Sequence, residues 1–91
     1  MDVDYDPAKR ALTLDMRGLD MARAGEILEG PNLTREDDRQ DYGEARYITV
    51  GFLDDRIVVM VWTDRDMGLR VISLRKANAR EQKIYGPRLF G

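Results

Sequence analysis

Residues 45–63 read ARYITVGFLDDRIVVMVWT, a stretch dominated by β-branched and aromatic side chains. Such side chains favour β-strands. The pair Asp54-Asp55 interrupts the apolar pattern and predicts the tight turn of a β-hairpin. The second half, residues 56–63, is almost entirely apolar, which predicts a central strand covered on both faces. The stretch therefore indicates an antiparallel sheet with this hairpin at its centre.

The sequence that follows the hairpin predicts one more strand and a helix. Residues 64–68 have the composition of a second turn, and residues 69–74 form another apolar, strand-like run. The sequence NARE at 78–81 resembles a capping box, in which the first and last side chains satisfy each other's backbone N–H groups. We expect the helix to continue to about Tyr85 and to end at Gly86-Pro87.

The sequence that precedes the hairpin predicts two helices. Asp6-Pro7 is a favourable helix start, and Gly18 is a typical stop just after Arg17. Asp20 predicts a second N-cap, and Gly30-Pro31 predicts the end of that second helix. Apolar side chains recur at helical spacing in both segments: Ala8, Ala11, Leu12 and Met16 in the first, and Met21, Ala24, Ile27 and Leu28 in the second.

Residues 32–34 predict a short edge strand, and the polar residues 35–45 predict an exposed loop. The order of helices and strands predicts an α+β fold. It has two N-terminal helices, an antiparallel β-meander of three to four strands and a C-terminal helix, with the helices packed on one face of the sheet. The length predicts one domain that spans residues 1–91.

Composition excludes several kinds of site. The 91 residues include no cysteine and no histidine, which excludes disulfides, thiolate catalysis, a Ser-His-Asp triad and zinc sites built on those side chains. The N-terminus has no apolar signal region and no apolar run is long enough to cross a membrane, so we expect a cytoplasmic protein.

Charge is distributed unevenly along the chain. The net charge is −2, but residues 1–45 hold 6 basic and 12 acidic side chains, whereas residues 46–91 hold 9 basic and 5 acidic ones. A basic second half indicates an anionic partner such as a nucleic acid. The alternative is a folded surface on which the two halves mix and the charges cancel.

Basic side chains gather where the last strand meets the last helix. Arg75 and Lys76 come just before the helix N-cap, and Arg80 lies in its first turn. A helix N-terminus with nearby cations is a potential phosphate site, although these could also be solvated surface charges. Arg70 lies five residues before Arg75, so strand alternation places the two on opposite faces unless the strand bulges.

Glu81 and Tyr85 are four residues apart and share a helical face, as a base and an acid for phosphodiester cleavage would. Alternatively, Glu81 completes the capping box and Tyr85 packs on the sheet. Arg46 either pairs with Glu44 or faces the same concavity as the last helix. The acidic residues between 36 and 44 do not have EF-hand spacing, so we expect a solvated loop and no metal site.

Several of these segments together resemble the BrnT toxins. They are DPAK at 6–9, Gly18, GEARYITVG at 43–51, RVISLRKA at 70–77, and the pair Glu81 and Tyr85. Their order and spacing are similar to those of the family over residues 3–85. The most specific part is the pattern R-x-I-S-x-R-x-A-x-x-x-E-x-x-x-Y.

The resemblance implies the toxin of a type II toxin–antitoxin pair, similar in fold to RelE. Such toxins are metal-independent ribonucleases that arrest bacterial growth and need no cofactor. A BrnA-like antitoxin masks the toxin, carries the DNA-binding domain and represses the operon. From the resemblance together with the basic second half, we expect phosphate binding and charge stabilisation by Arg46, Arg70, Arg75 and Lys76, proton transfer by Glu81 and Tyr85, and substrate contacts by Arg17 and Arg80.

The chain departs from the family pattern at the end of the first helix. Where the family has N-x-x-K-H-G-V, this chain has Thr13, Met16, Arg17, Gly18 and Leu19, so the Lys and His are absent. Two hypotheses follow. The first is an active endoribonuclease that relies on arginine and lysine for charge stabilisation. The second is a weakened or inactive homologue that binds the antitoxin and contributes to operon repression.

Overall fold

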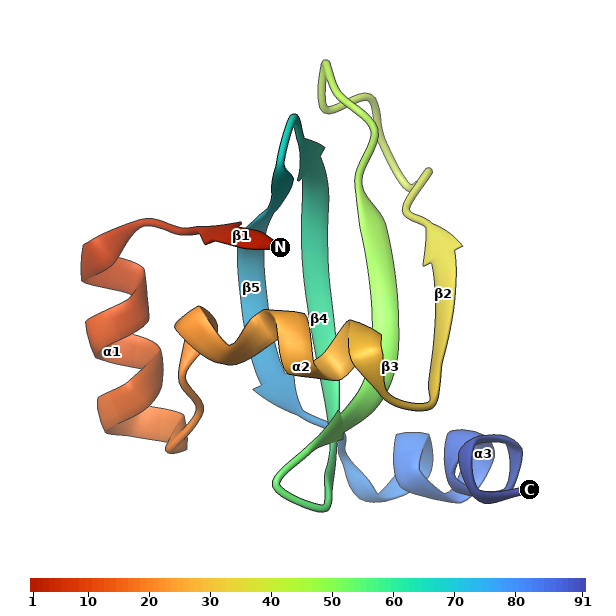
Figure 1. The fold of residues 1–91 in the computed structure, drawn as a ribbon. Coiled ribbons are helices and arrows are strands. Elements are labelled where there is room, and N and C mark those ends of the chain that lie inside the picture. Colours follow the sequence, from red (N-terminus) through yellow and green to blue (C-terminus); the bar gives the residue numbers. More distant parts are fainter.

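The computed structural model describes residues 1–91 and has an α+β fold (Figure 1). Its elements in chain order are β1 (Asp2–Asp4), α1 (Pro7–Arg17), the 3₁₀ turn η1 (Met21–Arg23), α2 (Ala24–Glu29), β2 (Asn32–Glu36), β3 (Tyr47–Leu53), β4 (Arg56–Arg65), β5 (Gly68–Lys76) and α3 (Ala79–Phe90). The predicted strands are all present, and β2, β4 and β5 are longer than the sequence indicated.

The sheet has five strands in the order β1-β5-β4-β3-β2. Strands β2 to β5 form the predicted antiparallel meander, but β1 adds a parallel strand beside Gly68–Arg70 of β5. The sheet is therefore mixed, and the prediction of an antiparallel sheet of three to four strands was incomplete. Three residues with two aspartates carry almost no strand signal, so β1 exists because β5 offers it a free edge.

The β3–β4 hairpin has the predicted turn at Asp54-Asp55. Both aspartates have positive φ, at 52° and 61°. This geometry matches the right-handed twist of the flanking strands. Strand β4 is central, as predicted, with Val58 and Met60 in the hydrophobic cluster on one face and Val59 in the cluster on the other.

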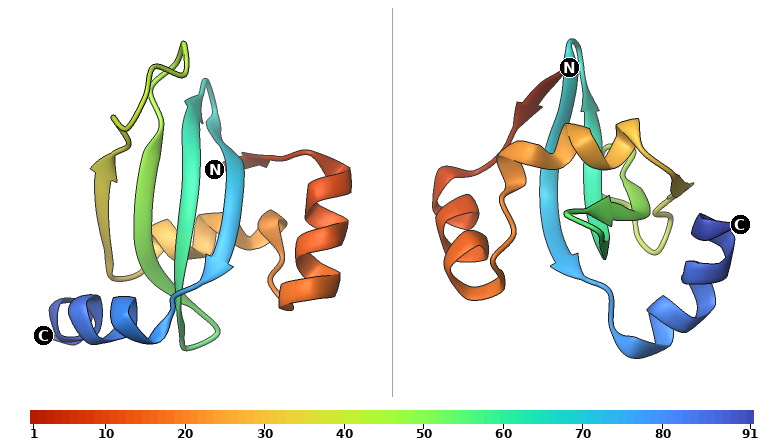
Figure 2. Two further views of the ribbon diagram at one scale, coloured as in Figure 1. Left: turned by 180° about the vertical axis from the view of Figure 1, so that it is seen from behind. Right: turned by 60° about the horizontal axis from the view of Figure 1, so that its bottom comes forward.

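The helices lie on both faces of the sheet, which corrects the prediction that they share one face (Figures 1 and 2). The segment of η1 and α2 crosses one face, where Met21, Ala24 and Ile27 are buried in a cluster with side chains of β3, β4 and β5. Helix α3 packs Leu89 against β3 and β4 on the opposite face. None of the helices is long and apolar enough to cross a membrane.

Helix α1 lies beside the edge of β5 and does not bury its apolar stripe. Leu12 and Met16 are 58% and 73% exposed, so the apolar side chains that recur along this helix do not face the core. The helix contacts the sheet through polar groups, because Lys9 Nζ donates to the Ile72 carbonyl and Arg17 donates to the Leu74 carbonyl at 2.8 Å. Only the first part of β5 pairs with β1, so these side chains cover carbonyls that would otherwise lack a partner.

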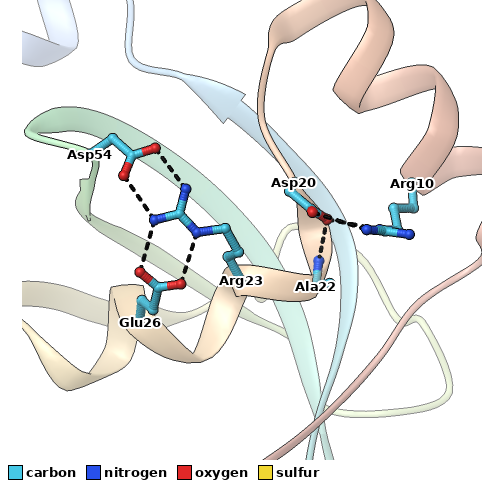
Figure 3. A network of polar contacts seen from close by, with 6 residues as sticks. All are labelled: Arg10, Asp20, Ala22, Arg23, Glu26 and Asp54. Atoms are coloured by element: carbon cyan, nitrogen blue, oxygen red, sulfur yellow. Dashed lines mark hydrogen bonds and ion pairs between the residues drawn. The ribbon is translucent and has the colours of Figure 1, made fainter.

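A polar network fixes α2 on the sheet (Figure 3). Asp20 caps η1 by accepting from the Ala22 N–H at 2.9 Å and also binds Arg10. Arg23 binds two carboxylates, those of Glu26 and Asp54, which ties α2 to the β3–β4 turn. The N-cap predicted at Asp20 is therefore present.

Helix α3 begins at the predicted capping box but continues past the predicted stop. Asn78 and Glu81 satisfy each other's backbone N–H groups, and the helix then runs through Gly86-Pro87 to Phe90. A proline inside a helix removes one hydrogen bond and crowds the residue before it. Here that residue is a glycine without a Cβ, and burial of Leu89 with packing of Phe90 on Phe52 at 5.0 Å favours the longer helix.

A candidate anion-binding cleft

A cleft of about 560 Å³ lies on the face of the sheet opposite α2. Strands β2 to β5 form its floor, and the loop after β2 and helix α3 contribute to its walls. Its lining includes Arg35, Arg39, Ser73, Arg75, Glu81, Tyr85 and Arg88, together with the apolar side chains Leu33, Ile48, Val50, Val59 and Val61. Four arginines against one glutamate give the cleft a positive charge, although the whole chain is slightly acidic.

Arg75 and Glu81 form a bidentate ion pair at the junction of β5 and α3. The guanidinium nitrogens of Arg75 donate to the two carboxylate oxygens of Glu81 at 2.7 and 2.9 Å. This guanidinium, together with the backbone N–H of Asn78, lowers the pKa of Glu81 to about 2. Glu81 is therefore a carboxylate at neutral pH, and its oxygens already accept three hydrogen bonds.

A second bidentate pair holds the loop at the other side of the cleft. Arg39 donates to both carboxylate oxygens of Asp37 at 2.7 and 2.8 Å, and the Tyr42 hydroxyl donates at 3.2 Å. The Asp37 side chain is only 1% exposed, and the Arg39 guanidinium lowers its pKa to about 2. Asp37 thus anchors the loop and fixes Arg39 at the cleft.

The other two arginines of the cleft, Arg35 and Arg88, are exposed and form no ion pair. Pairing of Arg35 with Ile48 places Arg35 on the cleft face of β2. Arg88 follows Glu81 and Tyr85 at helical spacing on α3. Both were missed from sequence, because residue 35 was assigned to a loop and the last helix was expected to end before residue 88.

Three of the eight predicted site residues come together in the cleft: Arg75, Glu81 and Tyr85. Arg70 lies on the same face as Arg75 but outside the cleft, paired with Asp4 at 2.6 Å. The expectation that Arg70 and Arg75 lie on opposite faces is corrected by a bulge in β5. Val61 and Trp62 are consecutive in β4, but their partners in β5 are Ser73 and Val71. Ile72 is therefore the extra residue of the bulge, and the side chains of β5 change face by one residue across it.

The remaining predicted residues do not line the cleft. Lys76 follows Arg75 directly and points to the opposite face, while Arg80 is exposed on α3 without an ion pair. Arg46 lies before β3 with its guanidinium carbon 4.1 Å from the centre of the Tyr42 ring and its Nε 3.9 Å from Glu44. Arg17 binds the Leu74 carbonyl and so contributes to the attachment of α1.

The acidic side chains of the loop between β2 and β3 are exposed except for Asp37, and no group of three or more acidic side chains is placed to hold a metal ion. The side chains that line the cleft offer arginine guanidinium groups, a tyrosine hydroxyl and a serine hydroxyl beside apolar side chains. Guanidinium groups bind phosphate oxygens, and an aromatic ring beside apolar side chains can contact a base. This combination fits an unpaired nucleotide better than a fully apolar ligand.

Comparison with known proteins connects this geometry to a family. Residues 5–81 match the family described as "Ribonuclease toxin, BrnT, of type II toxin-antitoxin system". No curated protein matches the chain. The matched region includes strands β2 to β5 and both ion-paired arginines of the cleft, and it ends at Glu81 in the first turn of α3.

Proposed function

This chain belongs to the BrnT family of ribonuclease toxins, and on that premise we propose that the cleft is the site of metal-independent RNA cleavage. The family implies an RNA target and an antitoxin partner. We further propose that the partner is a small BrnA-like protein that carries the DNA-binding domain, so that the toxin meets operator DNA only through it. Free toxin would act in the cytoplasm and arrest growth.

The observation that supports the cleft as the site is the bidentate Arg75–Glu81 pair beside Tyr85 on a face lined by three further arginines. A guanidinium held by two hydrogen bonds is oriented before the substrate arrives. Groups that are already oriented stabilise developing charge without the cost of reorganisation. The absence of histidine from the chain makes this manner of catalysis the one its residues can best supply.

In the proposed reaction, the 2′-oxygen of one nucleotide attacks the adjacent phosphorus and loses its proton to solvent. The bond from phosphorus to the 5′-oxygen breaks, and that oxygen takes a proton from the Tyr85 hydroxyl, which solvent then replaces. The products are a 2′,3′-cyclic phosphate and a 5′-hydroxyl. Arg75 stabilises the extra negative charge on the pentavalent phosphate, and Glu81 acts as a positioning residue that holds Arg75.

The test is cleavage of mixed single-stranded RNA by the purified, partner-free protein in excess EDTA, with analysis of the product ends. We expect cyclic phosphate ends with the wild type, and about a 10²–10³-fold lower rate with Arg75→Ala because one charge-stabilising donor is lost. Arg56→Ala is the matched control, since Arg56 is exposed, forms no ion pair and lies outside the cleft. Equal rates for the two variants would reject the cleft as the site.

Intact RNA from folded wild-type protein would favour the second candidate, a homologue that only binds its antitoxin. The loss of the family's Lys and His near Met16 and Arg17 is the observation behind that candidate. Helix α1 carries Met16 and Arg17, and it exposes the apolar side chains of Leu12 and Met16 among charged ones. Co-purification of the inactive chain with its antitoxin would then be the expected result.

A further inference from the structure

We propose that Arg35 and Arg88 hold the phosphates that flank the cleaved one, so that the cleft binds a single strand across β2, β5 and α3. The inference rests on the proposed function and concerns two residues that neither the sequence prediction nor the family match assigns. Arg88 lies outside the matched region, which ends at residue 81.

The first argument is the distribution of ion pairs among the four arginines of the cleft. Arg75 and Arg39 are each neutralised by a bidentate carboxylate, Glu81 and Asp37 respectively. Arg35 and Arg88 have no carboxylate partner, although both line the same cleft. The uncompensated charge of the cleft therefore lies on these two side chains, and a polyanion is attracted to uncompensated charge.

The second argument is their placement relative to the proposed reacting group. Arg88, Tyr85 and Glu81 lie along one side of α3, and Glu81 holds Arg75. Arg35 lies across the sheet on β2, with the apolar floor of Leu33 and Val50 beside it. A strand that crosses the cleft with its reacting phosphate at Arg75 would thus have cationic side chains on two different elements for its neighbouring phosphates.

The apolar floor favours one strand over a duplex. A duplex would contact the arginines at the rim and leave the half-buried Leu33 and Val61 in contact with water. An unpaired base can be turned onto these side chains and the Tyr85 ring, as occurs in proteins that bind single strands. Phosphate contacts by Arg35 and Arg88 would then set the register of the strand and contribute little to its sequence preference.

The test compares Arg35→Gln, Arg88→Gln and the control Arg56→Gln in binding to a mixed-sequence 2′-O-methyl oligoribonucleotide, which lacks the attacking hydroxyl and stays intact. We expect each cleft variant to raise Kd about tenfold at low salt and to flatten the slope of log K against log salt by about 0.7, the value for one single-strand phosphate contact. Neither arginine is buried or ion-paired, so these variants should fold normally.

Cleavage assays separate the possible outcomes. On unmodified RNA we expect both cleft variants to raise KM by a similar factor and to change kcat by less than about twofold, because the flanking contacts are made equally in the ground and transition states. A selective fall in kcat would instead place these residues on the reacting phosphate and overturn the inference. The inference would also be overturned if the cleft variants had the same slope of log K against log salt as Arg56→Gln.

Failure of this inference can be distinguished from failure of the proposed function. If the wild type cleaves RNA while both cleft variants match the control, only the flanking contacts are rejected. If the wild type neither binds nor cleaves RNA, both the proposed function and the flanking contacts are rejected. If the variants keep RNA binding but lose the antitoxin, the two arginines serve the protein partner and the inference is rejected.

Discussion

Two roles are compared for Glu81 in the cleft: a proton acceptor in the reaction, and a positioning residue that holds Arg75. As a proton acceptor it would need a pKa closer to neutral, whereas its pair with Arg75 lowers its pKa to about 2. We therefore expect Glu81→Gln to lower kcat about tenfold by loosening Arg75, while the wild type and the variant keep parallel pH–rate profiles above about pH 4. The measurement is kcat against pH for both proteins.

A profile in which the wild type has an acidic limb that Glu81→Gln lacks would contradict this expectation, because it would mean that Glu81 titrates during turnover. Gln82→Ala is the neighbouring control, since Gln82 is exposed and makes only a hydrogen bond to the Ala77 carbonyl. An equal loss of kcat in both variants would assign the effect to the start of α3 in general.

Some side chains of the cleft could be predicted from the sequence and others could not. Glu81 and Tyr85 were predictable because a capping box and a four-residue helical spacing are local patterns, and Arg75 because it comes just before the predicted helix start. Arg88 shares that spacing and was missed only because Gly86-Pro87 usually ends a helix. Lys76 was selected because it follows Arg75, and Arg46 because it opens a strand. Strand alternation directs Lys76 elsewhere, and the contact with Tyr42 does the same for Arg46.

Strand β1 depends on a close approach between two backbones. A Cβ built on Gly68 would lie 1.8 Å from the carbonyl oxygen of Asp2, so no larger side chain fits while β1 remains paired. We expect Gly68→Ala to release β1, to break the Asp4–Arg70 pair and to lower the thermal midpoint. Hydrogen exchange of the amides of β1 and of residues 68–70, together with thermal unfolding, would measure this.

Gly25→Ala is the matched control for Gly68→Ala. A Cβ at Gly25, inside α2, would meet only Val3 Cγ2 at an ordinary contact distance of 3.8 Å. Alanine is favoured over glycine inside helices by about 1 kcal/mol, so this variant should be as stable as the wild type or more so. If Gly68→Ala retained the protection and midpoint of the wild type, the parallel pairing of β1 would be rejected.

The helices and strands that were predicted correctly have signals within the segment itself. The Asp6 cap, the Asp54-Asp55 turn and the apolar run of β4 are examples. The differences depend on contacts that the local pattern does not contain. Strand β1 and the bulge at Ile72 need a partner strand, the longer α3 needs the pocket for Leu89, and α1 turns toward β5 because unpaired carbonyls attract Lys9 and Arg17.

The shape of the cleft depends on two carboxylate–arginine pairs, one on each side. Asp37 holds the loop and Glu81 holds the start of α3, and both carboxylates have a pKa of about 2 in the folded chain against ordinary values of 3.8 and 4.5. A pKa that is lower in the folded state means that the unfolded state binds more protons as the pH falls. The stabilisation is therefore complete above about pH 4.5 and is lost as the pH falls through about 2.

We accordingly expect the thermal midpoint of the whole chain to fall steeply between pH 4.5 and about 2, with a smaller fall in Asp37→Asn and in Glu81→Gln. The double variant should show the smallest fall, because both protonation sites are gone and the two sites lie on different elements. Asp38→Asn, at an exposed carboxylate with no hydrogen-bond partner beside Asp37, should follow the wild-type curve. If the thermal midpoints of all these proteins fell in parallel with pH, the acid sensitivity would come from other carboxylates of the fold. The two pairs would then orient arginines in the cleft without stabilising its walls.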